Sequence, residues 1–312
     1  SIRLLQVDRS LVENGIMDLA LRQEIQLENF ADETAVYYMP YYYAETNVSK
    51  KIIELSQSTI KGIDIDIEEE INKLEDENNI SLANNQREAI RQSIENGVLI
   101  VTGGPGTGKT TTINTIIQLF ENHEFKISLA APTGRAAKRM SEATGRDAST
   151  IHRLLEYGFA DEEIGMAFSK DEGTPLETDV IIIDEVSMVD IVLMNNLVKA
   201  IMPGTRLILV GDTDQLPSVG AGNVLKDIIE SRIVKVVELN EIFRQARESM
   251  IIVNAHKINK GEAPDLNVKD KDFFFLNGKS PNDVVSTVID LARERLPKFN
   301  GYDPIRDIQI LS

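Results

Sequence analysis

The sequence predicts an α/β protein whose parallel sheet is flanked by helices and preceded by a mainly helical N-terminal region. Beyond residue 80, short apolar runs rich in β-branched side chains alternate with helical stretches, which is the pattern of βαβ units. The runs show no polar alternation, as expected for strands that helices cover on both faces. The predicted strands are residues 98–102, 127–131, 180–183, 207–210 and 234–239.

Residues 1–80 are predicted to form a mainly helical accessory domain, because apolar side chains recur there at helical spacing. One aromatic run, 36–43, could hold a strand interrupted by Pro40. Its tyrosines suggest either stacking on nucleic-acid bases or packing, and we favour packing. The acidic stretch 64–77 is interpreted as a solvated helix or linker, and it marks a domain boundary near residue 80.

Composition narrows the classes of function. The 312 residues are enough for two domains, and the absence of cysteine excludes disulfides, thiolate nucleophiles and cysteine-based zinc sites. No run of about 18 apolar residues and no signal-peptide pattern occur, so we expect a cytoplasmic protein without a membrane partner. The net charge of −17 disfavours nucleic-acid binding, but residues 1–80, with 17 acidic and 7 basic side chains, carry more than half of it.

A phosphate-binding loop follows the first predicted strand. Residues 103–110 read GGPGTGKT and fit the pattern G-x-x-x-x-G-K-S/T in full. Glycines let the backbone N–H groups of such a loop turn towards phosphates at the start of a helix. Lys109 would reach the β and γ phosphates, and the Thr110 hydroxyl would ligate Mg²⁺. The nucleotide-binding residues predicted here are Gly104, Pro105, Gly106, Thr107, Gly108, Lys109, Thr110 and Thr111.

Polar residues follow two further strands. Asp184 and Glu185 end the apolar run 180–183, where buried carboxylates are costly unless they act on a metal or a water. Asp184 would hold Mg²⁺ through water and Glu185 would polarise the attacking water, although a helix N-cap is the alternative for this pattern. Gln215 follows the run 207–210 and could sense a γ-phosphate, although an ordinary turn has the same composition.

Taken together, these motifs resemble the superfamily 1 DNA helicases, and within them the RecD-type group that includes the exonuclease V alpha subunit. Seven segments in the family's order carry the resemblance, which covers about residues 81 to 260. The segments are 82–90, 103–112, 131–140, 149–155, 184–189, 211–222 and 239–245.

The resemblance implies a RecA-like P-loop NTPase that uses ATP and Mg²⁺. It implies that Gln86 reads adenine and that Arg244 contacts the γ-phosphate, where a forked cation suits the transferring group. A surface ion pair is the alternative for Arg244. The implied catalytic residues are Glu185, Lys109, Gln215 and Arg244. The implied DNA-binding residues are Pro132, Thr133, Arg135, His152 and Arg153, of which Arg135 fits a solvated surface equally well.

The same resemblance divides the chain into domains. Residues 81–305 would form the first motor domain, with a β-hairpin insertion at 156–178 that helps to split duplex DNA, although a surface loop suits this stretch nearly as well. Residues 306–312 resemble the first strand of a second RecA-like half. Because the family's remaining motifs have no counterpart after Arg244, we expect this chain to bind nucleotide but to hydrolyse it weakly or not at all.

Three hypotheses for function follow. The first is an ATP-driven 5′-to-3′ helicase or translocase in DNA recombination and repair, acting on single-stranded DNA and on duplexes with a 5′ overhang. The second is a RecD-like subunit of a multi-protein exonuclease V complex that does not unwind DNA alone, with residues 1–80 docking on other subunits. The third is a clamp-loader or other AAA-type ATPase, which leaves the segments 211–222 and 243–245 unexplained.

Overall fold

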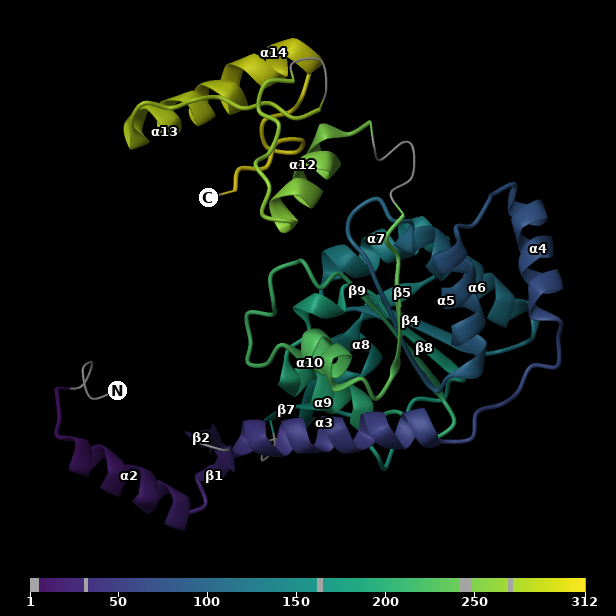
Figure 1. Cartoon of the computed structure of the whole chain (residues 1–312), viewed down its shortest axis with the longest axis vertical. Helices are drawn as coiled ribbons and strands as arrows, with labels where there is room; N and C mark the ends of the chain where they lie inside the picture. Colours follow the sequence, from purple (N-terminus) through teal and green to yellow (C-terminus); the bar gives the residue numbers. More distant parts are fainter. Residues whose placement is uncertain (1–5, 31–32, 162–164, 242–247, 269–271, 312) are drawn as a thin grey trace. The chain divides into compact units, whose positions relative to one another are not determined.

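The computed structural model describes residues 6–30, 33–161, 165–241, 248–268 and 272–311 (Figure 1). The chain divides into two compact units, Ser1–Phe243 and Arg244–Ser312. The domain boundaries expected near residues 80 and 305 therefore do not coincide with the division between these units.

The first unit is built on a six-stranded sheet with the strand order β10-β3-β9-β8-β4-β5. All neighbouring strands in it run parallel, as the sequence predicts. The edge strand β5 is an addition, because two of its three residues lie in a segment, 149–155, that we had assigned only to a helicase motif. The strands are β3 (Val98–Thr102), β4 (Ile127–Ala131), β5 (Ala148–Thr150), β8 (Val180–Ile183), β9 (Arg206–Gly211) and β10 (Lys235–Glu238).

Helices cover both faces of this sheet, which gives a RecA-like α/β fold (Figure 1). Alternate residues of β3 point to opposite faces, so Ile100 belongs to one apolar cluster and Leu99 to the other. The helices of the first face are α3 (Met39–Gln57), α8 (Ile151–Leu154), α9 (Ile191–Lys199) and α10 (Val224–Ser231). Those of the second face are α4 (Ile67–Asn78), α5 (Asn84–Glu95), α6 (Lys109–Asn122) and α7 (Gly134–Thr144).

The N-terminal region contains an unpredicted hairpin besides its helices. Helix α2 (Arg9–Leu21) precedes the antiparallel strands β1 (Ile25–Phe30) and β2 (Glu33–Tyr38). We had considered that Pro40 interrupts a strand, and this is wrong. Pro40 lies in the first turn of α3, where its missing N–H costs nothing. The packing expected of the tyrosines in 36–43 applies to Tyr37 and Tyr42, whose rings lie 5.8 Å apart and are half-buried.

Helices α3 and α4 are part of the core around the sheet. Val48 and Ile52 of α3 are 4% exposed and share a cluster with β3, while Ile71 and Leu74 of α4 are fully buried on the other face. From Ile67 onwards the acidic stretch 64–77 is thus a helix with one solvated and one buried face. Asp66 caps it, because its carboxylate accepts hydrogen bonds from the N–H groups of the first turn.

Arg206 ties the connection between α3 and α4 to the sheet. Its guanidinium is 1% exposed and donates hydrogen bonds to the carbonyls of Lys61 (2.7 Å) and Ile94 (3.0 Å). The group also lies over the rings of Phe120 and Phe125, at 5.4 and 5.3 Å. Burial lowers the pKa of Arg206, and these contacts offset part of that cost.

The second unit is helical in the part that the structure describes. Its elements are α12 (Met250–Asn259), α13 (Pro281–Asp290), the π-helix Leu291–Arg295 and α14 (Leu296–Asn300). The strand expected at 306–312 is wrong for the described residues 306–311, which form the end of a turn followed by chain without regular secondary structure. A strand needs a partner to satisfy its backbone, and no strand is present in the described residues of this unit. No described helix is long and apolar enough to span a membrane.

Candidate active site

The carboxyl ends of four parallel strands bring the predicted site residues to one edge of the sheet. The phosphate loop follows β3, the turn with Gln215 follows β9, Asp184 follows β8, and Pro132 follows β4; these strands are successive neighbours. Backbone hydrogen bonds join the ends: the N–H of Gly103 donates to the carbonyl of Gly211 (3.3 Å). Ligands of open α/β sheets bind at this edge.

The phosphate loop has the backbone that its glycines permit. Gly106 and Gly108 have φ angles of 75° and 83°, in the left-handed region where a Cβ is disfavoured. The Thr107 hydroxyl is buried and donates to the Gly104 carbonyl at 2.9 Å, which closes the loop on itself. Helix α6 starts at Lys109 directly after the loop, so its N-terminal dipole and free N–H groups face the loop.

Lys109 lies over this loop. Its ammonium donates hydrogen bonds to the carbonyl oxygens of Gly103 and Gly104, the latter at 3.1 Å. The same charge acts on Asp184, so the two groups belong to one electrostatic cluster. Thr110 and Thr111 follow in the first turn of α6, and the Thr110 side chain is exposed. The loop residues and Lys109 therefore lie together as the sequence predicts.

Gln86 contacts the phosphate loop directly. Its side chain is 1% exposed, its Oε1 accepts a hydrogen bond from the N–H of Ala83 (2.9 Å), and its Nε2 donates to the carbonyl of Gly108 (3.1 Å). Both ends of the carboxamide thus bond to protein backbone and link the start of α5 to the loop. An adenine contact by Gln86 stays an expectation from the resemblance.

The carboxylates after β8 have contrasting surroundings. Burial raises the pKa of Asp184, against the hydrogen bond that its Oδ1 accepts from the N–H of Glu185 (2.8 Å) and the charges of Lys109 and Arg139. Glu185 has a φ of 54°, a conformation that costs a residue with a side chain about 1 to 2 kcal/mol. Strain of this kind persists where the surroundings enforce it, and it often marks functional sites.

Gln215 lies next to the segment that follows Glu185. The Ser187 hydroxyl donates to the Oε1 of Gln215 at 3.3 Å, which links the turn after β9 to the turn after β8. Asp212 is 4% exposed, and its carboxylate accepts from the N–H of Asp214 at 2.9 Å. Sequence reasoning missed Ser187 and Asp212, although both lie inside motif segments and only their contacts distinguish them.

The donor set at this edge fits Mg²⁺. Asp184 supplies a largely buried carboxylate whose charge a cation would stabilise, and Thr110 supplies a hydroxyl. Mg²⁺ is commonly held by one or two carboxylates together with substrate phosphates and water. Within the described ranges no group of three or more His, Cys, Asp or Glu side chains could hold a metal without such help.

The predicted DNA contacts lie at the ends of the neighbouring strands β4 and β5. Pro132 and Thr133 follow β4, and the Thr133 hydroxyl caps α7 by accepting from the N–H of Ala136 (3.2 Å). Arg135 is exposed in the first turn of α7. Thr133 therefore has a structural role in this fold, whatever else it contacts. His152 and Arg153 lie exposed on α8, which follows β5.

An antiparallel hairpin lies in the segment where we expected one. Strands β6 (Tyr157–Asp161) and β7 (Gly165–Phe168) form it, and the ring of His152 lies 5.6 Å from that of Phe168, so α8 supports the hairpin. Phe159 and Met166 face each other across the strands and are 70% and 56% exposed. The hairpin thus presents an apolar surface to solvent.

Arg244, the last predicted catalytic residue, lies outside the described residues, as do Phe243 and Gln245 of its motif.

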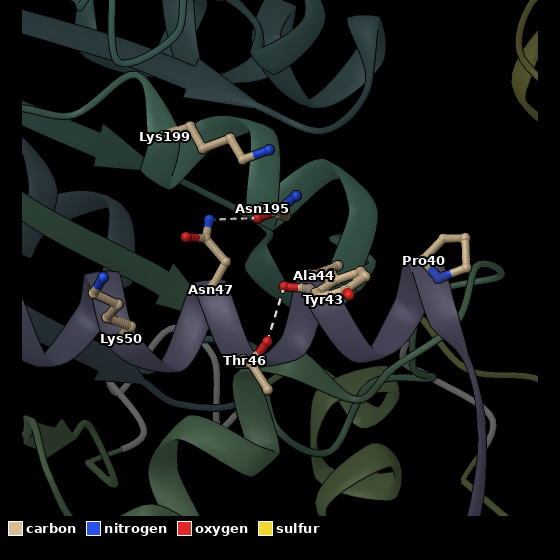
Figure 2. A pocket seen from close by; sticks show the side chains of 8 residues that line it. All are labelled: Pro40, Tyr43, Ala44, Thr46, Asn47, Lys50, Asn195 and Lys199. Atoms are coloured by element: carbon tan, nitrogen blue, oxygen red, sulfur yellow. Dashed lines mark hydrogen bonds between the residues drawn. The ribbon is translucent and has the colours of Figure 1, made fainter. Parts of the chain in front are cut away.

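A pocket of about 560 Å³ between α3 and α9 was not predicted from the sequence. Asn47 of α3 points towards Asn195 of α9, and its Nδ2 donates to the Asn195 Oδ1 at 2.6 Å (Figure 2). Lys50 and Lys199 also line it, whereas no predicted site residue does. Polar residues on helices resemble ordinary surface in a sequence, so no sequence signal could have found this pocket.

Comparison with known proteins identifies related sequences. Residues 86–221 match the family described as an AAA domain. The chain is 42% identical over 183 residues to the ATP-dependent RecD2 DNA helicase of Deinococcus radiodurans, a stretch that covers 59% of this chain and 24% of that protein. It is 38% identical over 205 residues to the RecBCD enzyme subunit RecD of Mycobacterium tuberculosis, covering 57% of this chain and 35% of the subunit.

A solved structure of the Pif1 helicase from Candida albicans matches 72% of this chain and 56% of its own chain, with 24% identity and a TM-score of 0.45. The matches to the two sequence relatives span only about a quarter to a third of those proteins' lengths. The residues that match the AAA domain family, 86–221, include the phosphate loop and the turns with Asp184 and Gln215 at the carboxyl edge of the sheet. The chain is thus similar to a RecD2 DNA helicase and to RecBCD subunits over part of their length, and residues 86–221 match the AAA domain family.

Proposed function

We propose that this chain is the ATP-binding part of a RecD-type motor that moves 5′ to 3′ along DNA in recombination and repair. The observation that carries the proposal is the convergence at one sheet edge of the phosphate loop, the buried Asp184, the strained Glu185 and Gln215. The names of the relatives, a DNA helicase and a RecBCD subunit, support the same substrate class.

The geometry suits in-line transfer of the γ-phosphoryl group to water. Lys109 and the loop N–H groups would hold the phosphates, while Thr110 and Asp184 would hold Mg²⁺, which neutralises charge on the phosphates. Glu185 would accept a proton from the attacking water while the oxygen of that water bonds to the γ-phosphorus. The bond from that phosphorus to the bridging oxygen breaks, and ADP leaves with the electron pair. Gln215, held by Ser187, would report whether the γ-phosphate is present.

DNA would pass the ends of β4 and β5, where Arg135 lies on α7 and where His152 and Arg153 lie on α8, the helix that contacts the hairpin β6–β7. Exposed Phe159 and Met166 at the hairpin would act as an apolar wedge at a duplex fork. Because the chain is acidic overall, this local basic track would supply the contacts to the phosphate backbone.

A second candidate is a nucleotide-dependent subunit of a complex of the exonuclease V type that does not unwind DNA alone. The observation in its favour is the name of the relatives that are RecBCD subunits. In that case the N-terminal region, with exposed Leu11, Met17 and Leu21 on α2, would contact other subunits. Either protein would act in the cytoplasm.

The experiment that tests the proposal measures ATP hydrolysis and strand separation by the intact protein with matched duplexes that carry a 5′ tail, a 3′ tail or no tail. We expect single-stranded DNA to stimulate hydrolysis and only the 5′-tailed duplex to be unwound. Stimulated hydrolysis without unwinding would favour the subunit, and unwinding restricted to 3′ tails would overturn the polarity. A protein without DNA-stimulated hydrolysis would overturn both.

A further inference from the structure

Arg139 of α7 faces the carboxylate of Glu185 across the carboxyl edge of the sheet. Its Nη1 lies 4.0 Å from the Glu185 Oε1, and the Arg139 side chain is 75% exposed while that of Glu185 is 22% exposed. The pair joins the helix that follows β4 to the turn that follows β8. A group that would touch the reacting water is thus held by a solvated cation on a different element.

The next cation along α7, Lys138, has a different partner from Arg139. Lys138 is equally exposed, at 78%, but pairs with Glu142 on its own helix at 3.7 Å. Arg139 also acts on Asp184, whose pKa its charge lowers against the effect of burial. The Arg139 guanidinium therefore interacts electrostatically with both carboxylates, Asp184 and Glu185, from the exposed face of α7.

An ion pair of this kind is easily exchanged. Exposed pairs contribute little to stability, because water screens them and long side chains must be ordered to form them. A phosphate group competes well for arginine, because two of its oxygens can accept hydrogen bonds from the guanidinium fork. DNA that lies along α7 would therefore offer Arg139 a better partner than the Glu185 carboxylate.

We propose that Arg139 is a positioning residue that restrains Glu185 until a nucleic-acid phosphate withdraws the guanidinium. This inference rests on the proposed function. While paired, the guanidinium, 4.0 Å from the Glu185 Oε1, attracts the carboxylate and so restrains its orientation towards the attacking water. Once Arg139 turns to a phosphate, Glu185 is free to accept the proton of that water. DNA binding at α7 thus raises the rate of hydrolysis through one side chain.

The test compares Arg139→Ala, Arg139→Lys and the matched control Lys138→Ala in the intact protein, with steady-state hydrolysis measured at saturating Mg²⁺ with and without single-stranded DNA. We expect Arg139→Ala to raise kcat without DNA about two- to fivefold, the factor that an exposed ion pair provides. The KM for ATP and the kcat at saturating DNA stay as in the wild type, so stimulation falls by the same factor. Lys138→Ala keeps the wild-type ratio of kcat with DNA to kcat without DNA, and Arg139→Lys has a ratio between those of the wild type and Arg139→Ala.

Other results separate the possible failures. If Arg139→Ala weakens DNA binding but leaves kcat without DNA unchanged, Arg139 is only a phosphate contact and the inference is wrong. A fall in kcat under both conditions would mean that Arg139 supports the active conformation of Glu185, which also overturns it. A wild-type protein that shows no stimulation by DNA would remove the proposed function and this inference together, whereas normal stimulation in both Arg139 variants removes the inference alone.

Discussion

The Gln86 side chain donates a hydrogen bond to the carbonyl oxygen of Gly108, at 3.1 Å, and so joins the start of α5 to the phosphate loop. Gly108 has a left-handed backbone, and Lys109 follows it directly. The hydrogen bond from Gln86 therefore helps to fix the position of the loop residues that would hold the phosphates. The carboxamide is almost fully buried, and its loss would take from the Ala83 N–H the acceptor that Gln86 provides, whereas the Gly108 carbonyl would still accept from Thr112.

Gln86→Ala is therefore expected to lower the free energy of unfolding by about 1 to 3 kcal/mol, the cost of leaving one buried polar group, the Ala83 N–H, unsatisfied. If the residue positions the loop, affinity for ATP and for GTP should fall by the same factor. Calorimetric titration with both nucleotides and denaturant unfolding check this. Gln92→Ala, on the same helix but bonded to Asn96, is the control. A loss confined to ATP would show instead that Gln86 reads adenine.

Lys109→Ala is expected to reduce ATP binding or hydrolysis by about 10² to 10³ while the fold is kept, because it removes the cation that stabilises charge on the phosphates. Nucleotide binding and circular dichroism of the intact protein are the measurements. Lys73→Ala, which removes an exposed lysine of α4, serves as the control. Activity at the wild-type level would exclude Lys109 from the site.

Glu185→Gln is expected to keep ATP binding and to lower turnover by about 10² to 10⁴, because the amide cannot accept the proton of the water. The substitution preserves side-chain size, so the backbone at φ 54° should persist. Binding and single-turnover hydrolysis should be measured on the same sample. Loss of ATP binding would indicate that Glu185 has a structural role.

The titration of Asp184 is expected to make the free energy of unfolding depend on pH in the absence of Mg²⁺ and nucleotide. Burial raises the pKa of Asp184 in the folded chain above its value in the unfolded chain, so the folded state binds the proton more tightly. The stability contributed by its protonated form is complete below the unfolded pKa, near 3.9, and is lost as the pH rises through the folded pKa.

The variant Asp184→Asn removes this titration and keeps an oxygen that can accept from the Glu185 N–H. We expect it to have a higher melting temperature than the wild type at pH 7, with a difference that shrinks towards pH 4. Mg²⁺ should stabilise only the wild type. Melting curves from pH 4 to 8 check both statements, and a constant difference across this range would contradict them.

Much of the architecture could be predicted because it is encoded locally. Three of the five predicted strands have the expected bounds, since fully apolar β-branched runs between helices fit only a sheet covered on both faces. The exceptions lie where local signals are ambiguous. Pro40 suits a broken strand or the first turn of a helix, and the preceding strand β2 is stable because β1 pairs with it. Residues 306–311 have a strand-like composition but no described strand to pair with.

The site divides in the same way. The sequence by itself determined the chemistry: a phosphate loop with Lys109 and Thr110, two acids after a buried strand, and a set of motifs that resembles those of RecD-type helicases. Only the tertiary structure decided which groups meet, because packing distant segments sets their distances and their exposure to water. It buried Gln86 against the loop, raised the pKa of Asp184 and set Arg139 opposite Glu185. Burial and charge separation depend on neighbours far along the chain, and no local pattern specifies them.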